Sequence, residues 1–206
     1  MNQHQVIPLF SQCLYVSGGE NYTLNDHEDE FIKRCPYREN LNNLISFSNN
    51  VLEEESMSGI KQHILSHVEN YTRDVLKISR HIEFKIVSSW INLTTKGKHH
   101  HQHIHGNSVI SGIFNISPNN KVMFGDMLGK PFQAWTMDVE EQNLFNSDTW
   151  SVVSEEPGNV ILFPSTLMHG VPTHKGDNVR TTISFNLMPQ GFIAKNTTDQ
   201  LNMKML

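Results

Sequence analysis

Cysteine, basic clusters and long apolar runs are all scarce in this chain of 206 residues. The two cysteines, Cys13 and Cys35, show no paired spacing, which argues against a disulfide framework and for a reducing compartment. No apolar run approaches the length of a membrane span, and the N-terminus lacks a basic segment followed by an apolar one. We therefore expect a cytoplasmic protein that associates with no membrane.

Positive charge is scarce as well. Lys and Arg number 16 against 21 Asp and Glu, which gives a formal net charge of −5 with His neutral, and no basic stripe is present. Duplex nucleic acid, a polyanion, is therefore a poor partner. A chain of 206 residues is most naturally one domain with a sizeable core.

Hydrophobic periodicity changes near residue 80. Before it, apolar residues at spacings of three and four predict an amphipathic helix over 57–78, after a short helix over 25–35 and a strand over 5–16. From residue 82 apolar and polar residues alternate instead, which predicts strands.

Turn signals divide this second part into short β-prone runs, among them 109–116, 121–124, 160–163 and 180–186. Many short strands with polar turns predict a mainly β fold with flanking helices, either a sandwich or a jelly roll. We expect one domain made of three parts, namely an N-terminal scaffold over 1–80, a β core over 81–190 and a C-terminal tail over 191–206.

Histidine is the most informative residue type. Five histidines stand within residues 99–105, and another follows at His169. Imidazole is the commonest neutral metal ligand. His103 and His105, if they begin a strand, point to one face of it, and His169 on a distant strand would complete a three-coordinate site with open positions. From the cluster alone, a metal site and an exposed polar loop both remain open.

The strand over 180–186 has a polar face that carries Arg180 and Thr182. Taken alone, this alternation favours a strand with one face in solvent, because antiparallel sheets commonly show it. The alternative is that the polar face lines a ligand cavity, where Arg180 would offer its planar guanidinium to a carboxylate.

The combination of these motifs resembles the iron(II)- and 2-oxoglutarate-dependent oxygenases. It also resembles, more narrowly, an oxygenase subfamily found in bacteria and phages. The resemblance covers about residues 82–188 and rests on the following stretches: Ser89–Asn92, His103-Ile104-His105-Gly106-Asn107-Ser108, Ser111–Phe114, Pro157–Ser165, His169 and Arg180–Asn186. It implies a cupin-like double-stranded β-helix.

The resemblance also implies a site. His103, His105 and His169 would hold the metal, and Arg180 would grip the distal carboxylate of 2-oxoglutarate with Thr182 as the neighbouring hydroxyl.

Two further assignments in this expected site stay open, namely the role of Asn92 and the identity of the third metal ligand. Asn92, on the strand before the histidines, is a candidate donor to the co-substrate, and an ordinary polar residue at a strand end is the alternative. His105 stands where a carboxylate is usual in this superfamily, so Asn107 and Asp126 stay open as alternatives for the third metal ligand.

The implied activity is that of a dioxygenase that uses iron(II), 2-oxoglutarate and O2, with ascorbate as a candidate reductant. It would hydroxylate a protein side chain or a small molecule in a bacterium or a phage-infected host, with oxidative decarboxylation of 2-oxoglutarate to succinate. Two alternatives remain: a three-histidine cupin that does not use 2-oxoglutarate, and a non-catalytic β-sandwich module. The sequence identifies neither the substrate nor the oligomeric state.

Overall fold

The computed structural model describes residues 5, 7, 11–18, 22–125, 138–147 and 149–204. Its helices are α1 (Asp26–Arg34) and α2 (Ser58–Glu69), with the short 3-10 helices η1 (Val51–Glu53) and η2 (Glu55–Met57) before α2 and the π-helix η3 (Asn70–Val75) after it. The strands are β1 (Tyr15–Val16), β2 (Tyr37–Asn40), β3 (Asn43–Ser46), β4 (Glu83–Thr94), β5 (His100–His103), β6 (Ile110–Asn115), β7 (Asn120–Gly125), β8 (Thr149–Ser154), β9 (Val160–Pro164), β10 (Met168–Val171), β11 (Arg180–Ile193) and β12 (Leu201–Met203).

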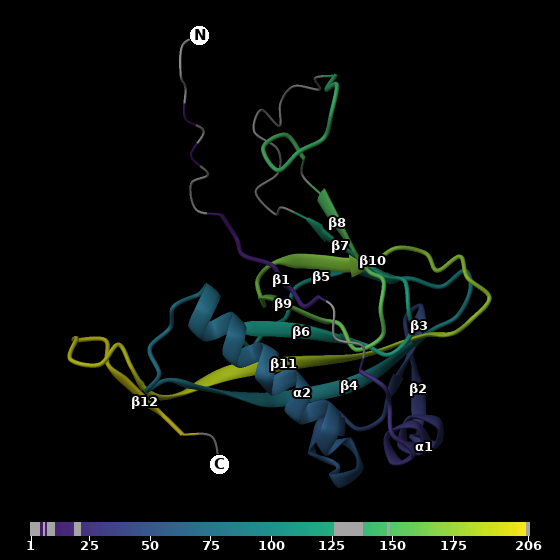
Figure 1. Ribbon diagram of the computed structural model, residues 1–206, viewed down its shortest axis with the longest axis horizontal. Coiled ribbons are helices and arrows are strands. Elements are labelled where there is room, and N and C mark those ends of the chain that lie inside the picture. The colour runs from purple at the N-terminus through teal and green to yellow at the C-terminus, as the bar shows by residue number, and fades with distance from the viewer. Residues whose placement is uncertain are drawn as a thin grey trace.

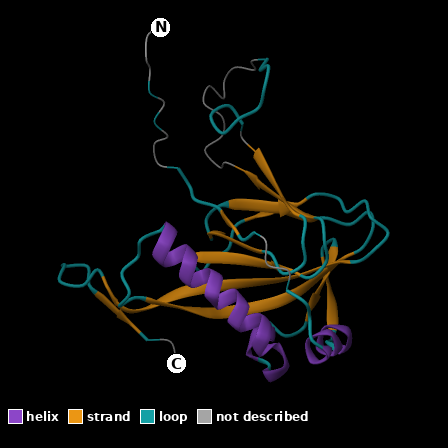
Figure 2. Cartoon of the chain, in the orientation of Figure 1, coloured by secondary structure: helices purple, strands orange, loops and turns teal. Residues whose placement is uncertain are grey.

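The strands form two antiparallel sheets that face each other (Figures 1 and 2). The major sheet has the order β1-β9-β6-β11-β4-β3-β2, with β12 paired to β11, and the minor sheet has the order β5-β10-β7-β8. This is the predicted double-stranded β-helix. Strands near in space are far apart in sequence, since β11 lies between β4 and β6.

Helix α2 covers the outer face of the major sheet (Figure 1). The apolar face predicted over 57–78 is buried at Ile60, Ile64 and Val68 of α2 and at Tyr71 of η3, which ends at Val75, an exposed residue. Burial of such a stripe, more than helix propensity, keeps a helix of this length folded.

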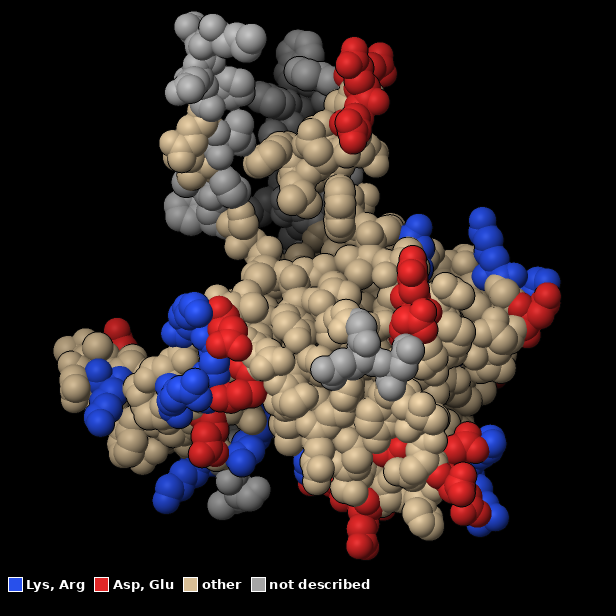
Figure 3. Space-filling model, in the orientation of Figure 1, with Lys and Arg blue, Asp and Glu red and all other residues tan. Residues whose placement is uncertain are grey.

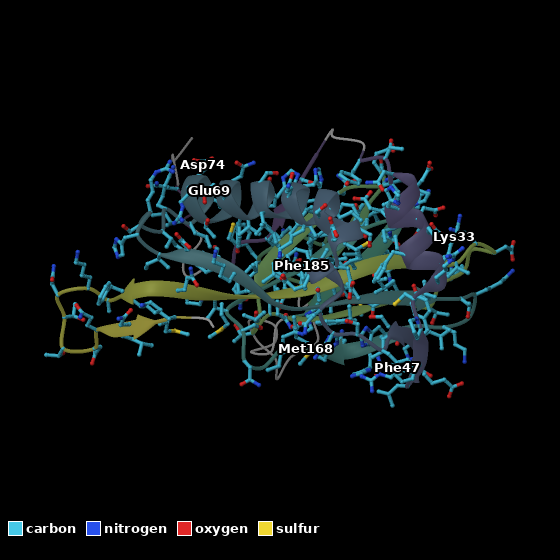
Figure 4. The ribbon with its side chains drawn as sticks, turned by 90° about the horizontal axis from the view of Figure 1, so that it is seen from below. Lys33, Phe47, Glu69, Asp74, Met168 and Phe185 are labelled. Atoms are coloured by element: carbon cyan, nitrogen blue, oxygen red, sulfur yellow. The ribbon has the colours of Figure 1, made fainter. Side chains whose placement is uncertain are left out.

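Two separate hydrophobic cores flank the major sheet. One lies between α2 and the sheet and contains Ile60, Ile183 and Phe185. Figure 4 shows Phe185 at the level of the sheet below α2, with Met168 on the opposite side. The second core lies between the two sheets around Phe124 and Phe163, whose rings meet at a centroid distance of 5.1 Å.

Several boundaries differ from the sequence prediction. In the described part of 5–16 only Tyr15–Val16 forms a strand. Strand β11 continues to Ile193 and pairs with β12, so part of the predicted tail is β structure. The hairpin β2–β3 joins the edge of the major sheet through β4, and no alternation in the sequence predicted it.

None of the described helices is long and apolar enough to cross a bilayer. On the face shown in Figure 3, Lys and Arg alternate with Asp and Glu around the periphery and form no continuous basic patch.

Candidate active site

A cavity between the two sheets gathers the residues that the sequence singled out. Asn92, Arg180 and Thr182 line it from the major sheet, and His103 and His169 line it from the minor sheet. The other lining residues include Asn43, Trp90, Thr94, His100, His105, Ile113, Phe163 and Ser184. The polar face of β11 therefore lines a cavity, and the interpretation that it faces solvent is wrong.

Three histidines converge at one place in this cavity. His103 ends β5 and pairs with His169 of β10, with 4.4 Å between the ring centroids. His105 follows in a loop, so the pair does not begin a strand as the sequence suggested. The Nε2 atoms of His105 and His169 lie 3.2 Å apart. One ring nitrogen from each histidine lies within 4.8 Å of the other two.

Hydrogen bonds to the backbone fix the tautomers of two of these rings. Nδ1 of His103 lies 2.9 Å from the carbonyl oxygen of His101, and Nδ1 of His169 lies 2.9 Å from that of Leu167. A carbonyl oxygen only accepts, so each Nδ1–H donates and each Nε2 keeps its lone pair. Histidines that bind metals commonly donate their second ring nitrogen in this way.

These rings suit a divalent metal in charge as well as in position. Burial lowers the pKa of His105 to about 3 and that of His169 to about 4, and it lowers the pKa of His103. All three imidazoles are therefore neutral at pH 7, as metal ligands must be. Two nitrogens bound to one ion at about 2.1 Å each lie roughly 3.0–3.4 Å apart, which the His105–His169 separation of 3.2 Å matches.

Arg180 brings a buried positive charge to the same cavity. Its side chain is on the first residue of β11, its exposure is 6%, and its Nε donates to Oδ1 of Asn120 at 2.6 Å. Burial lowers the pKa of the guanidinium to about 10, so it stays charged at neutral pH. No ion pair to Arg180 is present within the described residues, and its remaining N–H groups suit a carboxylate ligand.

A row of amides and a hydroxyl crosses the cavity wall from β3 to β11. Nδ2 of Asn43 donates to Oδ1 of Asn92 at 3.3 Å, and Nδ2 of Asn92 donates to Oγ of Ser184 at 2.9 Å. Sequence reasoning singled out Asn92 and missed Asn43, which lies on the unpredicted hairpin.

A chain of hydroxyl groups holds the loop that carries His105. The backbone N–H of His105 donates to the carbonyl oxygen of Ser165 at 2.9 Å. The Ser165 hydroxyl lies 2.8 Å from that of Ser108 and 2.9 Å from that of Ser111, which donates to Asn186 at 2.8 Å. The serines of the sequence motifs therefore attach the His105 loop to the major sheet.

Of the two other candidates for the third ligand, the structure describes only Asn107. Asn107 is exposed, has a left-handed backbone with φ 57° and does not line the cavity. Asp126 lies outside the described residues.

Part of this chain is similar in sequence to a known protein family. Residues 88–186 match the family described as "Putative 2OG-Fe(II) oxygenase". This part of the chain belongs to the 2OG-Fe(II) oxygenases. The match lies within the stretch 82–188 that carries the sequence resemblance, which is thereby confirmed. No curated protein matches the oxygenase chain significantly.

Several solved structures share the fold at low sequence identity. HygX from Streptomyces hygroscopicus, solved with nickel and 2-oxoglutarate bound, aligns with a TM-score of 0.58 and 12% identity over 90% of this chain and 88% of its own. A 2OG-Fe(II) oxygenase family oxidoreductase from Burkholderia pseudomallei aligns with a TM-score of 0.53 and 15% identity over 79% and 78% of the two chains. The epimerase SnoN, solved with Fe3+ and alpha-ketoglutarate, aligns with a TM-score of 0.52 and 7% identity over 84% and 80%.

Proposed function

We propose that this oxygenase is an iron(II)- and 2-oxoglutarate-dependent dioxygenase that hydroxylates an unidentified protein side chain or small molecule. The observation that carries the proposal is the joint presence, in one cavity, of three neutral imidazoles and an arginine that no acidic residue pairs with in the described chain. A cupin that does not use 2-oxoglutarate has a use for the histidines and none for Arg180.

His103, His105 and His169 are the residues proposed to hold the metal. Their donor set differs from the common pair of histidines and one carboxylate, and it leaves one more positive charge at the ion. Bound iron(II) would supply the oxygen chemistry that decarboxylates 2-oxoglutarate to succinate and carbon dioxide. The Nδ1 hydrogen bonds of His103 and His169 would keep their Nε2 lone pairs aimed at the ion.

Arg180 and Thr182 are proposed to bind the distal carboxylate of 2-oxoglutarate. Nε of Arg180 is already bonded to Asn120, which orients the guanidinium so that its terminal N–H groups remain for the ligand. Asn92 uses one amide N–H on Ser184, and its second N–H is proposed to reach the co-substrate. Phe163 and Ile113 in the lining would help to exclude water.

The cell compartment and the type of reaction are part of the proposal. Cys13 and Cys35 are both free thiols, in keeping with a reducing cytoplasm. Hydroxylation would add one oxygen atom to the substrate, whereas an epimerase such as SnoN is named for a change that leaves composition unaltered. Mass spectrometry of the converted substrate separates the two outcomes.

The proposal is tested on protein stripped of metal, reloaded with iron(II) without oxygen and then exposed to O2. We expect one iron per chain and succinate formation that requires iron(II), 2-oxoglutarate and O2 together, with ascorbate sustaining the rate. His169→Ala should abolish succinate formation, and His174→Ala, a substitution outside the cavity lining, should not.

Each negative result would favour a different functional class for this protein. Iron binding without binding of 2-oxoglutarate would favour the three-histidine cupin. Binding of neither iron nor 2-oxoglutarate would favour a non-catalytic β-sandwich module.

A further inference from the structure

A β-bulge in β5 brings a fourth histidine into the cavity. His103 pairs with His169 and His100 pairs with Val171, so three steps along β5 match two steps along β10. Such an extra residue re-aims side chains, because it breaks the alternation between the two faces of a strand. His100 and His103 consequently lie on one face, with stacked rings whose centroids are 4.5 Å apart at an angle of 28°.

Gly170 lies opposite this bulge and permits it. A Cβ atom at position 170 would come within 3.0 Å of the carbonyl oxygen of His100 and 3.2 Å of the backbone nitrogen of Gln102. Both separations are shorter than an ordinary van der Waals contact between a carbon atom and a backbone atom. The glycine therefore lets β10 approach β5 closely where the extra residue is accommodated, which fixes the place of the His100 ring.

His100 and Arg180 line the same cavity, and backbone hydrogen bonds connect the segments that lead to them. Just before β5, the backbone of Gly97 and Lys98 hydrogen-bonds to the backbone of His174, on the segment that leads to Arg180. Arg180 in turn pairs with Thr94, just before this segment of the chain.

The His100 ring has hydrogen-bonding capacity that the protein does not use. It lines the cavity, and neither ring nitrogen has a hydrogen-bond partner in the described part of the chain. Because no described group accepts a hydrogen bond from this ring, its N–H is available to a ligand in the cavity. A neutral imidazole donates one hydrogen bond, and a carboxylate beside Arg180 is a suitable acceptor.

We propose that His100 is a further co-substrate-binding residue, whose ring N–H donates to a carboxylate oxygen of 2-oxoglutarate. The inference rests on the proposed function and adds a residue that the motifs do not contain. A metal shared by His100, exposed His101 and His103 is the competing arrangement, since their ring nitrogens also lie within 4.8 Å of one another. A metal at that place would prevent His103 from binding a metal with His105 and His169. Nδ1 of His103 donates a hydrogen bond to a carbonyl oxygen, so only its Nε2 can bind an ion.

Two separate titrations test the proposal. Manganese(II) is first titrated into metal-free protein without 2-oxoglutarate, and 2-oxoglutarate is then titrated into manganese-loaded protein without oxygen. The variants are His100→Leu, which removes the donor, His100→Gln, which keeps an N–H, and His101→Leu as the matched control on the same strand. Circular dichroism checks the fold of each variant.

We expect His100→Leu to weaken 2-oxoglutarate binding about tenfold, the size of effect that one hydrogen bond to a charged group brings. The manganese(II) affinity of His100→Leu should stay within about twofold of the wild-type affinity, because His100 is not proposed to bind the metal. His100→Gln should lose less affinity for 2-oxoglutarate, and His101→Leu should change neither affinity.

Three results overturn the inference. Unchanged 2-oxoglutarate binding in His100→Leu, while wild type binds it, removes the role of His100 and leaves the proposed function intact. Loss of manganese(II) affinity in His100→Leu makes His100 a metal ligand. Absence of 2-oxoglutarate binding in wild type defeats the proposed function itself. If His100→Leu does not fold, His100→Met, which also lacks an N–H, gives the same comparison with His100→Gln.

Discussion

Truncation of Arg180 is the sharpest test of the co-substrate site. Arg180→Ala removes a cation that is 6% exposed and has no acidic partner within the described residues. A carboxylate bound beside Arg180 would then lose the one cationic side chain that lines the described part of the cavity. Breaking a buried ion pair typically costs about 3–5 kcal/mol. At about 1.4 kcal/mol per factor of ten, the affinity for 2-oxoglutarate should fall by at least about 100-fold.

Arg180→Lys should recover only part of this affinity. An ammonium group carries the charge and cannot reproduce the planar pair of N–H donors. It also cannot use Asn120 as the guanidinium does, where Nε donates at 2.6 Å and leaves the terminal nitrogens free.

The assay is calorimetry on manganese-loaded protein without oxygen, with two ligands. 2-Oxoglutarate has a distal carboxylate and pyruvate, another 2-oxo acid, has none. Wild type should prefer 2-oxoglutarate, and Arg180→Ala should lose that preference while its affinity for pyruvate stays unchanged. Arg38→Ala, at an exposed position of β2, is the matched control and should behave as wild type.

Two results would refute the reasoning. Equal binding of 2-oxoglutarate by wild type and Arg180→Ala would show that the distal carboxylate does not contact Arg180. An equal loss for 2-oxoglutarate and pyruvate would show that the substitution disturbs the whole cavity.

Three further predictions concern the metal, acid stability and packing. His169→Ala should weaken manganese(II) binding by more than the roughly 10–100-fold that loss of a ligand's supporting partner causes, and calorimetry should find exposed His101→Ala unchanged. Metal-free protein should lose stability as pH falls from about 6.5 toward 4, because the unfolded chain then binds protons that the half-buried His105 and the buried His169 do not. At about 1.4 kcal/mol per pKa unit for each ring, urea unfolding across this range should show a loss on the order of 5 kcal/mol, and a flat profile would contradict it. Gly112→Ala should destabilise by about 1–3 kcal/mol, because the new methyl group overlaps the buried ring of Phe185 and lies 2.9 Å from Leu162; Phe185→Leu in the same chain should restore part of it in urea unfolding, and additive losses would disprove the clash.

The sequence predicted those features that depend on local periodicity. The buried stripe of α2 and the alternation along β11 follow from side chains at fixed spacings. Periodicity alone did not reveal that the polar face of β11 lines a cavity, because that depends on the minor sheet packed over it. Burial of Thr182 at the cavity is a property of the pair of sheets and not of the strand.

The missed site residues share a physical cause. His100 reaches the cavity through a bulge, and strand alternation alone would assign it to the opposite face from His103. Asn43 sits on a short hairpin whose sequence has little alternation. Asn120, which orients Arg180, lies in a Pro-Asn-Asn stretch that predicts a turn, and only the fold brings it to β11.

The two faces of the major sheet have different roles, since one packs against α2 and the other lines the cavity. Along β11, Ile183 and Phe185 belong to the packing under α2, while Thr182 and Ser184 face the cavity. A single inserted residue would exchange the two sets, with hydroxyls among the apolar side chains and aromatic rings in the ligand space. The length of this strand is therefore more tightly constrained than its composition. Substitutions confined to the cavity face can alter which molecules are accepted, while the apolar face continues to specify the fold.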